Sequence, residues 1–311
     1  MEALKSKKIW NRKNKRRLFI VLMLAYPVFH FLFFWVFVNI NTIVMTFQTW
    51  KESTDFEDLG SSYYAFAGLL NYRVLFYSIA HDAKTREMIV NSLSYVVLNI
   101  CIILPLSLVA AYVLFKKIPL SGFYRVMFFL PSIIPLAALV VCFKSMLDSQ
   151  QGSLILLMKA LGIPDPGFLS TTKMLQVTIW LFMIWSGMGY NIILFSSAMA
   201  RMPMEVLESG KLEGVSSPRE LVQIVVPLIW PNITTMVLLG LMSTFTVAMQ
   251  PMMISGNVNN TIGLYIYSNS LGSNAGLISA ATLGLVCTIV AAPVVLVIRW
   301  LMERCFKDVT F

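Results

Sequence analysis

The run MIVNSLSYVVLNICIILPLSLVAAYVLF, residues 88–115, contains no charged side chain over 28 positions. A helix needs about 20 apolar residues to cross a hydrocarbon layer ~30 Å thick, so this run is long enough for one membrane span. Charge-free runs also cover residues 18–50, 126–143, 174–200 and 221–298. Breaker-rich sequences at 255–257 and 272–274 divide the last run into two spans. We therefore expect an all-α membrane protein with six transmembrane helices.

The composition of the 311-residue chain agrees with this interpretation, because 58% of the residues are hydrophobic and only 13% are charged. Soluble domains typically contain about 25% charged residues, so a soluble enzyme is excluded as the default. A disordered chain would need low hydrophobicity and high charge. Basic residues precede the first span, but its apolar run is longer than a signal-peptide core of about 7 to 15 residues, and we expect it to be retained.

Basic residues predict the orientation of the spans. The segments 1–17, 116–125, 201–220 and 299–311 together hold seventeen Lys and Arg residues against seven acidic ones. The segments between them hold seven basic residues against eight acidic ones. Because basic segments stay in the cytoplasm, both termini are expected there. Contact with anionic lipid explains the net charge of +9, so no nucleic-acid partner is needed.

The residues that usually carry chemistry are sparse and scattered. The chain has no phosphate-binding loop, nucleophile elbow or metal-ligand spacing, so we expect no catalytic residue, no metal and no cofactor of its own. An intramembrane enzyme remains an alternative, with His30 and a serine of another span as its only dyad. The uncharged middle of the spans argues against an ion-driven carrier. A partner is therefore expected to supply the energy. The four cysteines are interpreted as small apolar residues: Cys101, Cys142, Cys287 and Cys305.

The most informative polar segment lies between spans four and five and reads RMPMEVLESGKLEGVSSPRELVQIVVPLIWP, residues 201–231. Pro203 suits the first turn of a short helix, and Gly214 suits a turn that needs positive φ. We expect Ser217 to cap a second helix, with Pro218 at its first position and Glu220 closing a capping box. The segment is thus predicted to form a helix-turn-helix elbow.

This elbow resembles the EAA loop of binding-protein-dependent ABC importer permeases, whose pattern is roughly P-x-E-x-x-E-A-A-x-x-D-G-A followed by L-P. The matching residues are Pro203, Glu205, Glu208, Gly214, Leu221, Ile224 and Pro227. Ser209 and Gly210 replace the two alanines, Glu213 the aspartate and Val215 the last alanine. The glycine lowers the helix propensity by about 1 kcal/mol relative to alanine.

Other elements resemble the carbohydrate branch of the type I ABC importers in order along the chain. They are the FAGLLNY element at 66–72, Asn91 at the start of span two, Arg125 before Phe129-Leu130-Pro131, the Trp180 to Gly189 region, and the Thr261 to Tyr267 strip. The resemblance implies the type I importer transmembrane fold and covers most of the chain. It also implies the bacterial cytoplasmic membrane as the location.

The resemblance further implies that this chain is a permease subunit of a sugar or oligosaccharide importer. Its partners would be a second permease subunit in a heterodimer, a cytoplasmic ATPase dimer that binds ATP and Mg²⁺, an extracellular solute-binding protein, the sugar and membrane lipid. The elbow, especially residues 203–218, would couple to the ATPase. The implied coupling residues are Pro203, Glu205, Glu208, Lys211, Glu213, Gly214 and Pro218.

A sugar pathway needs uncharged polar and aromatic side chains at mid-membrane. The candidates are Trp185, Tyr190, Asn191, Thr246 and Gln250. Polar residues in spans also join helices to one another, and Gly187 and Gly189 can serve close packing. An alternative is therefore a structural permease half that does not contact substrate. The external segments 51–87 and 252–276 are both candidates for receiving the binding protein.

The expected organisation has four parts. A basic cytoplasmic segment covers 1–17, the first span with an external loop covers 18–87, and a type-1 transmembrane domain of five spans covers 88–302. The coupling elbow occupies 201–222 within that domain. A cytoplasmic tail covers 303–311. The particular sugar, the partner permease and the loop that receives the binding protein are not determined by the sequence.

Overall fold

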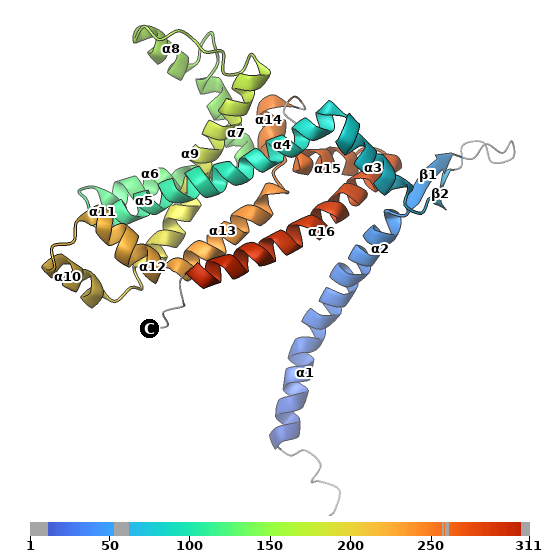
Figure 1. Ribbon diagram of the computed structural model, residues 1–311, viewed down its shortest axis with the longest axis horizontal. Helices are drawn as coiled ribbons and strands as arrows, with labels where there is room; N and C mark the ends of the chain where they lie inside the picture. Colours follow the sequence, from blue (N-terminus) through green and yellow to red (C-terminus); the bar gives the residue numbers. More distant parts are fainter. Residues whose placement is uncertain (1–11, 53–61, 257, 259–260, 306–311) are drawn as a thin grey trace, which may run out of the picture.

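The computed structural model describes residues 12–52, 62–256, 258 and 261–305. Four parts of the predictions lie outside this description: residues 1–11 of the basic segment, residues 53–61 of the external segment 51–87, residues 257, 259 and 260 of the segment 252–276 with its breaker sequence, and residues 306–311 of the tail. The described chain is a helical bundle from which the N-terminal helix extends away (Figure 1). Its most apolar helices match the predicted spans in order.

The first span is one continuous helix in three parts: α1 (Arg12–His30), the π-helical η1 (Phe31–Phe37) and α2 (Val38–Met45). It diverges from the other helices (Figure 1), and none of its most apolar window is buried against the rest of the chain. His30 is exposed on α1, and its ring packs on Tyr26 and Phe34 of the same continuous helix. These ring contacts lie within the first span, so the structure adds no support for a dyad with a serine of another span.

A small sheet connects this helix to the bundle, which the sequence did not predict. Strands β1 (Gln48–Glu52) and β2 (Ser62–Phe66) pair antiparallel, with Trp50 opposite Tyr64. The chain then turns at Gly68, whose φ is +56°. The Asn71 side chain donates hydrogen bonds to the carbonyl oxygens of Thr46 and Gln48, both at 2.8 Å. The FAGLLNY element therefore fixes the end of the first span to α3.

The bundle itself is built from long helices joined by short ones. The second span is continuous from Ala83 to Phe115, and the fourth and sixth spans are single helices. The remaining bounds of the first half are α3 (Leu70–His81), α4 (Ala83–Val97), π-helical η2 (Leu98–Ile103), α5 (Leu104–Phe115), α6 (Ser121–Ile133), α7 (Leu136–Met146) and α8 (Ser153–Ala160). Those of the second half are α9 (Thr172–Met199), α10 (Met204–Leu212), α11 (Ser217–Glu220), π-helical η3 (Leu221–Val225), α12 (Val226–Leu228), α13 (Trp230–Thr244), α14 (Met249–Ser255), α15 (Ile262–Ser270) and α16 (Asn274–Cys305).

Two of the predicted spans are bent rather than straight. Helices α6 and α7 meet at 108°, and the segment 217–228 meets α13 at 79°. Pro135 precedes α7, and Pro231 lies in the first turn of α13, where a missing N–H costs nothing. Among the described residues, four helices are long and apolar enough to cross a membrane, or six when each bent pair counts as one span. The six predicted spans therefore correspond to four straight helices and two bent ones.

The segment 252–276, predicted to connect spans five and six on the outside, is largely helical and partly buried in its described residues. Thr261 and Leu264 are fully buried at the start of α15. The Ile262 N–H donates to the Ser92 hydroxyl of α4 at 2.8 Å, and the Thr261 hydroxyl donates to the Val247 carbonyl oxygen at 2.6 Å. This segment folds back into the bundle because its backbone groups find partners there, which a charge-free sequence rich in Asn and Gly does not reveal.

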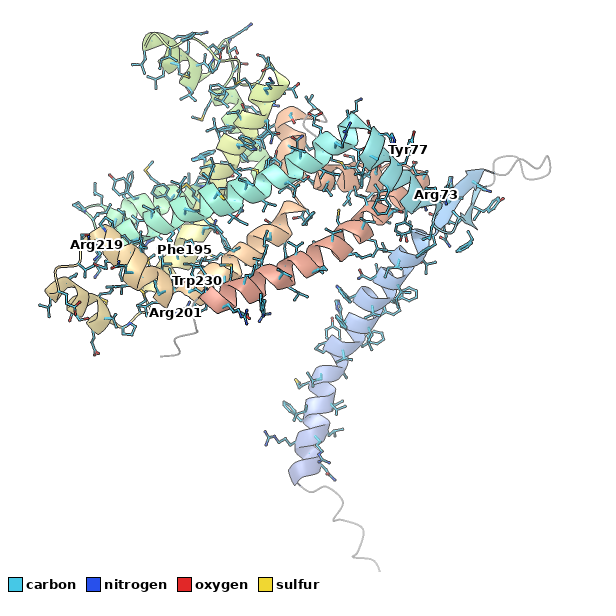
Figure 2. The ribbon with its side chains drawn as sticks, viewed as in Figure 1. Arg73, Tyr77, Phe195, Arg201, Arg219 and Trp230 are labelled. Atoms are coloured by element: carbon cyan, nitrogen blue, oxygen red, sulfur yellow. The ribbon has the colours of Figure 1, made fainter. Side chains whose placement is uncertain are left out.

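Close packing of α9 against its neighbours holds the bundle together. Its side chains Ile192, Phe195 and Met199 are buried in a cluster with α5 and α13 (Phe195 in Figure 2). Gly189 faces α6, where a Cβ atom would collide with the Phe128 carbonyl oxygen and lie 3.1 Å from the Phe129 Cα. The expectation that glycines in span four serve helix packing is confirmed for Gly189.

We predict that Gly189→Ala destabilises the protein by about 1 to 3 kcal/mol, because the added methyl group forces the α6 and α9 backbones apart. Thermal unfolding in detergent, followed by size-exclusion chromatography, measures the change. Gly187→Ala is the matched control, because its Cβ would meet only the Ile103 side chain at ordinary distances of 3.6 Å and above. Equal melting temperatures for the two variants would contradict the packing argument.

Candidate functional site

The predicted elbow is present at one end of the bundle (Figure 1). Helix α10 begins after Pro203 and ends before Gly214, which has a φ of +73°. The Gly214 N–H donates to the Lys211 carbonyl oxygen at 3.1 Å, and the Val215 N–H donates to the Gly210 carbonyl oxygen at 3.0 Å. These two bonds form a Schellman motif, in which a left-handed glycine satisfies the last carbonyl groups of a helix. The positive φ predicted for Gly214 is confirmed, and Pro203 lies just before the first turn of α10, as its N-cap residue, rather than within that turn.

The glycine that departs from the family pattern has a packing role. Gly210 is buried, and a Cβ atom there would lie 2.8 Å from the Ile224 Cδ1. Leu207, one turn earlier, is 3% exposed and belongs to the same buried cluster as Val225 and Ile229. The small residue therefore brings α10 close to the helix that follows the turn. The lower helix propensity of Gly210 thus accompanies closer packing between the two arms of the elbow, which are α10 and the helical segment 217–228.

The predicted capping box is wrong. The N-cap of α11 is Ser216 rather than Ser217, and its side chain makes no capping hydrogen bond. Ser217 and Pro218 occupy the first helical turn, so Glu220 lies one position too far along for a capping box. Its side chain turns inward to a different partner, and a tertiary contact has overridden the local pattern.

That partner is Lys116, at the end of span two. Its Nζ donates to both carboxylate oxygens of Glu220 at 2.6 Å, and the side chains are 27% and 3% exposed. The Tyr112 hydroxyl, one turn earlier on α5, donates to the Ser217 carbonyl oxygen at 3.1 Å. The Lys116 ammonium also lies 5.4 Å from the centre of the Tyr112 ring. Span two and the second arm of the elbow are thus joined by charge, by a hydrogen bond and by an aromatic contact.

The electrostatics of this pair favour its charged form. Burial of the Lys116 ammonium is the largest single influence and lowers its pKa, but hydrogen bonds and charge interactions with Glu220 and Tyr112 together outweigh it and raise the pKa of Lys116 above its ordinary value. The stabilisation from the pair is therefore complete below the ordinary lysine pKa and is lost as the pH rises through the raised value. The sequence predicts that Lys116 and Glu220 lie on the same side of the membrane. It contains no signal that Lys116 pairs with Glu220 rather than with one of the three other acidic residues of the elbow.

The predicted coupling residues of α10 and the turn point to solvent. Glu205, Glu208, Lys211 and Glu213 are all exposed, and none of them has an ion pair within the described part of the chain. Pro203 is half-buried at the start of α10, while Gly214 and Pro218 are exposed. Arg219, exposed on α11, lies at the same end of the bundle (Figure 2). Leu212 is 89% exposed beside these charges. The elbow thus presents three carboxylates and an apolar side chain on its free surface.

The predicted pathway residues occupy α9, α14 and the short link between α13 and α14. Trp185 stacks on Phe143 with ring centres 5.8 Å apart, and Tyr190 is 57% exposed. The Asn191 side chain donates to the Gly187 carbonyl oxygen at 3.2 Å, within its own helix. Thr246 donates to the Ser243 carbonyl oxygen at 2.8 Å, and Gln250 is half-buried. Both of these hydrogen bonds are local, so neither one joins two spans.

Three side chains with buried polar atoms, which the sequence interpretation missed, lie on α4 and α9. The Tyr95 hydroxyl, the Gln176 Oε1 and the Trp180 Nε1 are buried without a hydrogen-bond partner among the described residues. Gln176 Nε2 donates weakly to the Ser94 hydroxyl, at 3.5 Å. Buried polar groups are normally paired, so these three atoms are exceptions to that rule among the described residues. The sequence signal that could have indicated these side chains is the spacing of Gln176 and Trp180, which are four residues apart on α9 and therefore lie on the same face of that helix.

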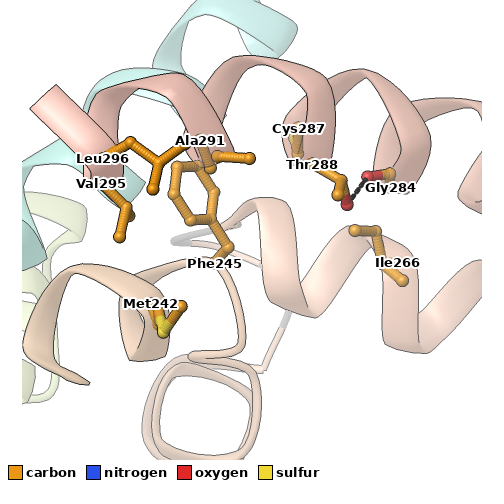
Figure 3. A pocket seen from close by; sticks show the side chains of 10 residues that line it. Met242, Phe245, Ile266, Gly284, Cys287, Thr288, Ala291, Val295 and Leu296 are labelled. Carbon is orange, nitrogen blue, oxygen red and sulfur yellow. Dashed lines mark hydrogen bonds between the residues drawn. The ribbon is translucent and has the colours of Figure 1, made fainter. Parts of the chain in front are cut away.

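An apolar pocket of about 530 Å³ lies between α13, α15 and α16 (Figure 3). The Phe245 ring points toward α16 there, and the Thr288 hydroxyl donates to the Gly284 carbonyl oxygen at 2.8 Å. The pocket thus has one hydroxyl, already bonded within its own helix, and its other lining side chains are apolar apart from Cys287. A sugar would find few partners, so this pocket is a poor site for it. No group of three or more His, Cys, Asp or Glu side chains suited to a metal occurs in the described ranges.

The family of the chain follows from comparison with known proteins. A family model described as "Binding-protein-dependent transport system inner membrane component" matches residues 90–310. The chain belongs to this family. It is a multi-pass membrane protein and a permease component of such a transport system, as the resemblance of the elbow indicated.

Relatives of this permease align over much of its length. It is 24% identical over 286 residues to the probable ABC transporter permease protein YurN of Bacillus subtilis, covering 89% of this chain and 94% of YurN. It is 27% identical over 228 residues to the lactose transport system permease protein LacF of Rhizobium radiobacter, covering 68% of this chain and 74% of LacF.

A solved structure shares the fold. A chain of the bacterial alginate ABC transporter, crystallised in complex with an alginate pentasaccharide-bound periplasmic protein, aligns with a TM-score of 0.78. The sequences are 18% identical, and the alignment covers 96% of this chain and 98% of the other. The predicted type I importer fold is confirmed.

We predict that Lys116→Met destabilises the elbow by about 3 kcal/mol, because it leaves the Glu220 carboxylate buried without a partner. Hydrogen exchange of the amides at 217–229 should become faster, and mass spectrometry measures it. The control is Glu303→Gln, which breaks the exposed pair with Arg299, whose side chains are 59% and 52% exposed. Exposed pairs contribute little, so this variant should exchange like the original protein. Unchanged exchange in Lys116→Met would contradict the role of the pair.

Proposed function

We propose that this permease is a subunit of an ATP-driven importer of sugars or oligosaccharides in the bacterial cytoplasmic membrane. The observation that carries the proposal is the elbow, which is joined to span two by the Lys116–Glu220 pair and exposes three carboxylates that have no ion pair among the described residues. Similar proteins include a lactose permease and the arabinooligosaccharides transport system permease protein AraP of Bacillus subtilis, 22% identical over 278 residues. Their named substrates support a carbohydrate for this chain.

The basic segments place the elbow and both termini in the cytoplasm, in line with the rule that Lys and Arg accumulate on that side. Partners of three kinds follow for this permease. A second permease subunit completes the pathway, a cytoplasmic ATPase dimer binds ATP and Mg²⁺, and an extracellular solute-binding protein delivers the sugar. The alginate transporter complex, with its periplasmic protein, supports these kinds of partner.

The geometry suggests how the ATPase would drive the spans. The exposed surface of α10, with Glu205, Glu208 and Lys211, docks on the ATPase, which moves when ATP closes its dimer. The second arm of the elbow carries that movement to α5 through Glu220 and Lys116. A charged pair at 2.6 Å resists separation because the Glu220 carboxylate, with a side chain only 3% exposed, would be left buried without compensation. The bundle therefore moves as the elbow moves.

The route of the sugar is proposed along α9 and the adjoining segments. Trp185 and Tyr190 offer aromatic faces, while Asn191, Thr246 and Gln250 offer hydrogen bonds. The competing proposal is a structural half that leaves substrate contact to the partner permease. The local bond of Asn191 to Gly187 favours that alternative for this residue.

We expect Gly214→Pro to leave the permease in the membrane but to uncouple ATP hydrolysis from uptake. Proline requires a φ near −65° and lacks the N–H that Gly214 donates, so the Schellman turn cannot form. ATPase activity and sugar uptake are measured in vesicles that contain the complete complex, with candidate sugars tested singly.

Gly162→Pro is the matched control, because Gly162 also has a positive φ, of +76°, and donates its N–H, but lies outside the elbow between α8 and α9. Coupled uptake by Gly214→Pro would refute the elbow assignment. Uptake of no carbohydrate by the original complex would refute the substrate class.

Asn191→Leu and Gln250→Leu should each reduce uptake about tenfold while ATP hydrolysis continues, because a lost hydrogen bond to bound sugar is worth roughly 1.4 kcal/mol. The control is Asn39→Leu, since Asn39 makes a similar bond within its helix, to Trp35, but lies on α2. Normal uptake by both pathway variants would favour the structural half.

A further inference from the structure

A second pocket, of about 600 Å³, lies at the elbow end of the bundle. It is formed where α5 ends, α6 begins and α9 completes its last turns. Its polar lining includes Lys117, Ser121, Arg125, Ser196 and Ser197, and none of its lining residues is acidic. The elbow and its predicted coupling residues do not line it, so the pocket is separate from the site described above.

The two cations of this pocket lack partners in the part of the chain that the structure describes. Neither Lys117 nor Arg125 makes an ion pair there, whereas the adjacent Lys116 is neutralised by Glu220. The Ser196 hydroxyl is buried at the pocket and has no hydrogen-bond partner within the same described residues. Two positive charges without an ion-pair partner among the described residues create a site that attracts an anion able to accept hydrogen bonds.

The backbone near the pocket has two further features, a residue in a left-handed conformation and the N-terminus of a helix. Lys117 has a φ of +55°, a left-handed conformation that non-glycine residues rarely adopt and that costs of order 1 kcal/mol or more. Helix α6 starts at Ser121 without a side-chain cap, so the positive end of its dipole faces this region. A glycine at 117 would adopt this conformation more easily, so lysine carries an energetic cost at this position.

The rest of the pocket is apolar. Leu114, Phe115 and Ile193 line it, and on the neighbouring α6 Val126 is 61% exposed and Leu130 51% exposed. The pocket lies at the end of membrane-spanning helices, where lipid headgroups lie, and basic pockets between spans on the cytoplasmic side suit anionic headgroups. An inorganic phosphate would use the cations but leave the apolar walls uncovered.

We propose that this pocket binds an anionic phospholipid, with its phosphate on Lys117 and Arg125 and the start of its acyl chains against Leu114 and Ile193. The site goes beyond the proposed transport function, since binding here requires neither sugar nor ATP.

The test uses the complete complex in vesicles that contain a photoactivatable phosphatidylglycerol in a phosphatidylcholine background. Mass spectrometry maps labelling of the peptides that contain residues 114–125 and 193–200. The variant Lys117→Gln/Arg125→Gln should reduce this labelling about tenfold, as expected for the loss of charge-assisted contacts. The control Arg16→Gln/Arg304→Gln removes the same charge from α1 and α16 and should leave the labelling unchanged.

A third variant separates binding from folding. Lys117→Gly relieves the left-handed backbone, so it should keep or raise the melting temperature of the complex while it lowers the labelling. Equal labelling in the original protein and the double variant would overturn the proposal and leave an acidic protein partner as the occupant. Loss of labelling in the presence of excess inorganic phosphate would show a soluble-anion site and would overturn the lipid assignment. Neither result depends on which solute is transported.

Discussion

Burial of the Glu220 carboxylate is the constraint on which the elbow end of this permease depends. Removing a carboxylate from water costs several kcal/mol unless a partner compensates it, and Glu220 is 2% exposed. Lys116 supplies the compensating charge at 2.6 Å, and it can do so only when the end of span two lies against α11. The position of the elbow is therefore not a property of the elbow alone. It is determined by a charge in another span, 104 residues earlier in the chain.

Packing extends this constraint through the bundle. Leu207 of α10 belongs to the same buried cluster as Tyr112 of α5, Phe195 of α9 and Val225 beyond the turn. Within a membrane, helices gain little from the hydrophobic effect against lipid, so close contact at small residues replaces it. Gly189 provides such a contact between α9 and α6, and Gly210 provides a similar close contact outside the spans, within the elbow. A movement of the elbow can reach the middle of the spans only through close contacts of this kind.

Much of the fold could be predicted because lipid imposes simple rules on sequence. A charge-free run of sufficient length forms a helix, since every backbone group must find a partner inside the segment. The same rules did not predict the structure of segments that are not straight membrane-spanning helices. The strand pair at 48–66 lies among polar and aromatic residues without a clear periodicity, and the segment 252–276 depends on partners such as Ser92 in another helix. The elbow was predicted from Pro203 and Gly214, because proline and glycine act locally through φ. The capping box failed since Glu220 had a better partner that was distant in sequence.

The sequence by itself determined the class of this protein, the number of its spans and the location of the elbow between the fourth and fifth. Hydrophobicity, charge and turn residues act over short stretches, so they can be interpreted without knowing what lies opposite. Only the tertiary structure decided that Lys116 pairs with Glu220 while Lys117 lines a pocket with Arg125, and that Tyr95, Gln176 and Trp180 are buried with polar atoms unpaired among the described residues. These features depend on which helix faces which. Two adjacent lysines have nearly the same local sequence, and the contacts across the bundle give them different roles.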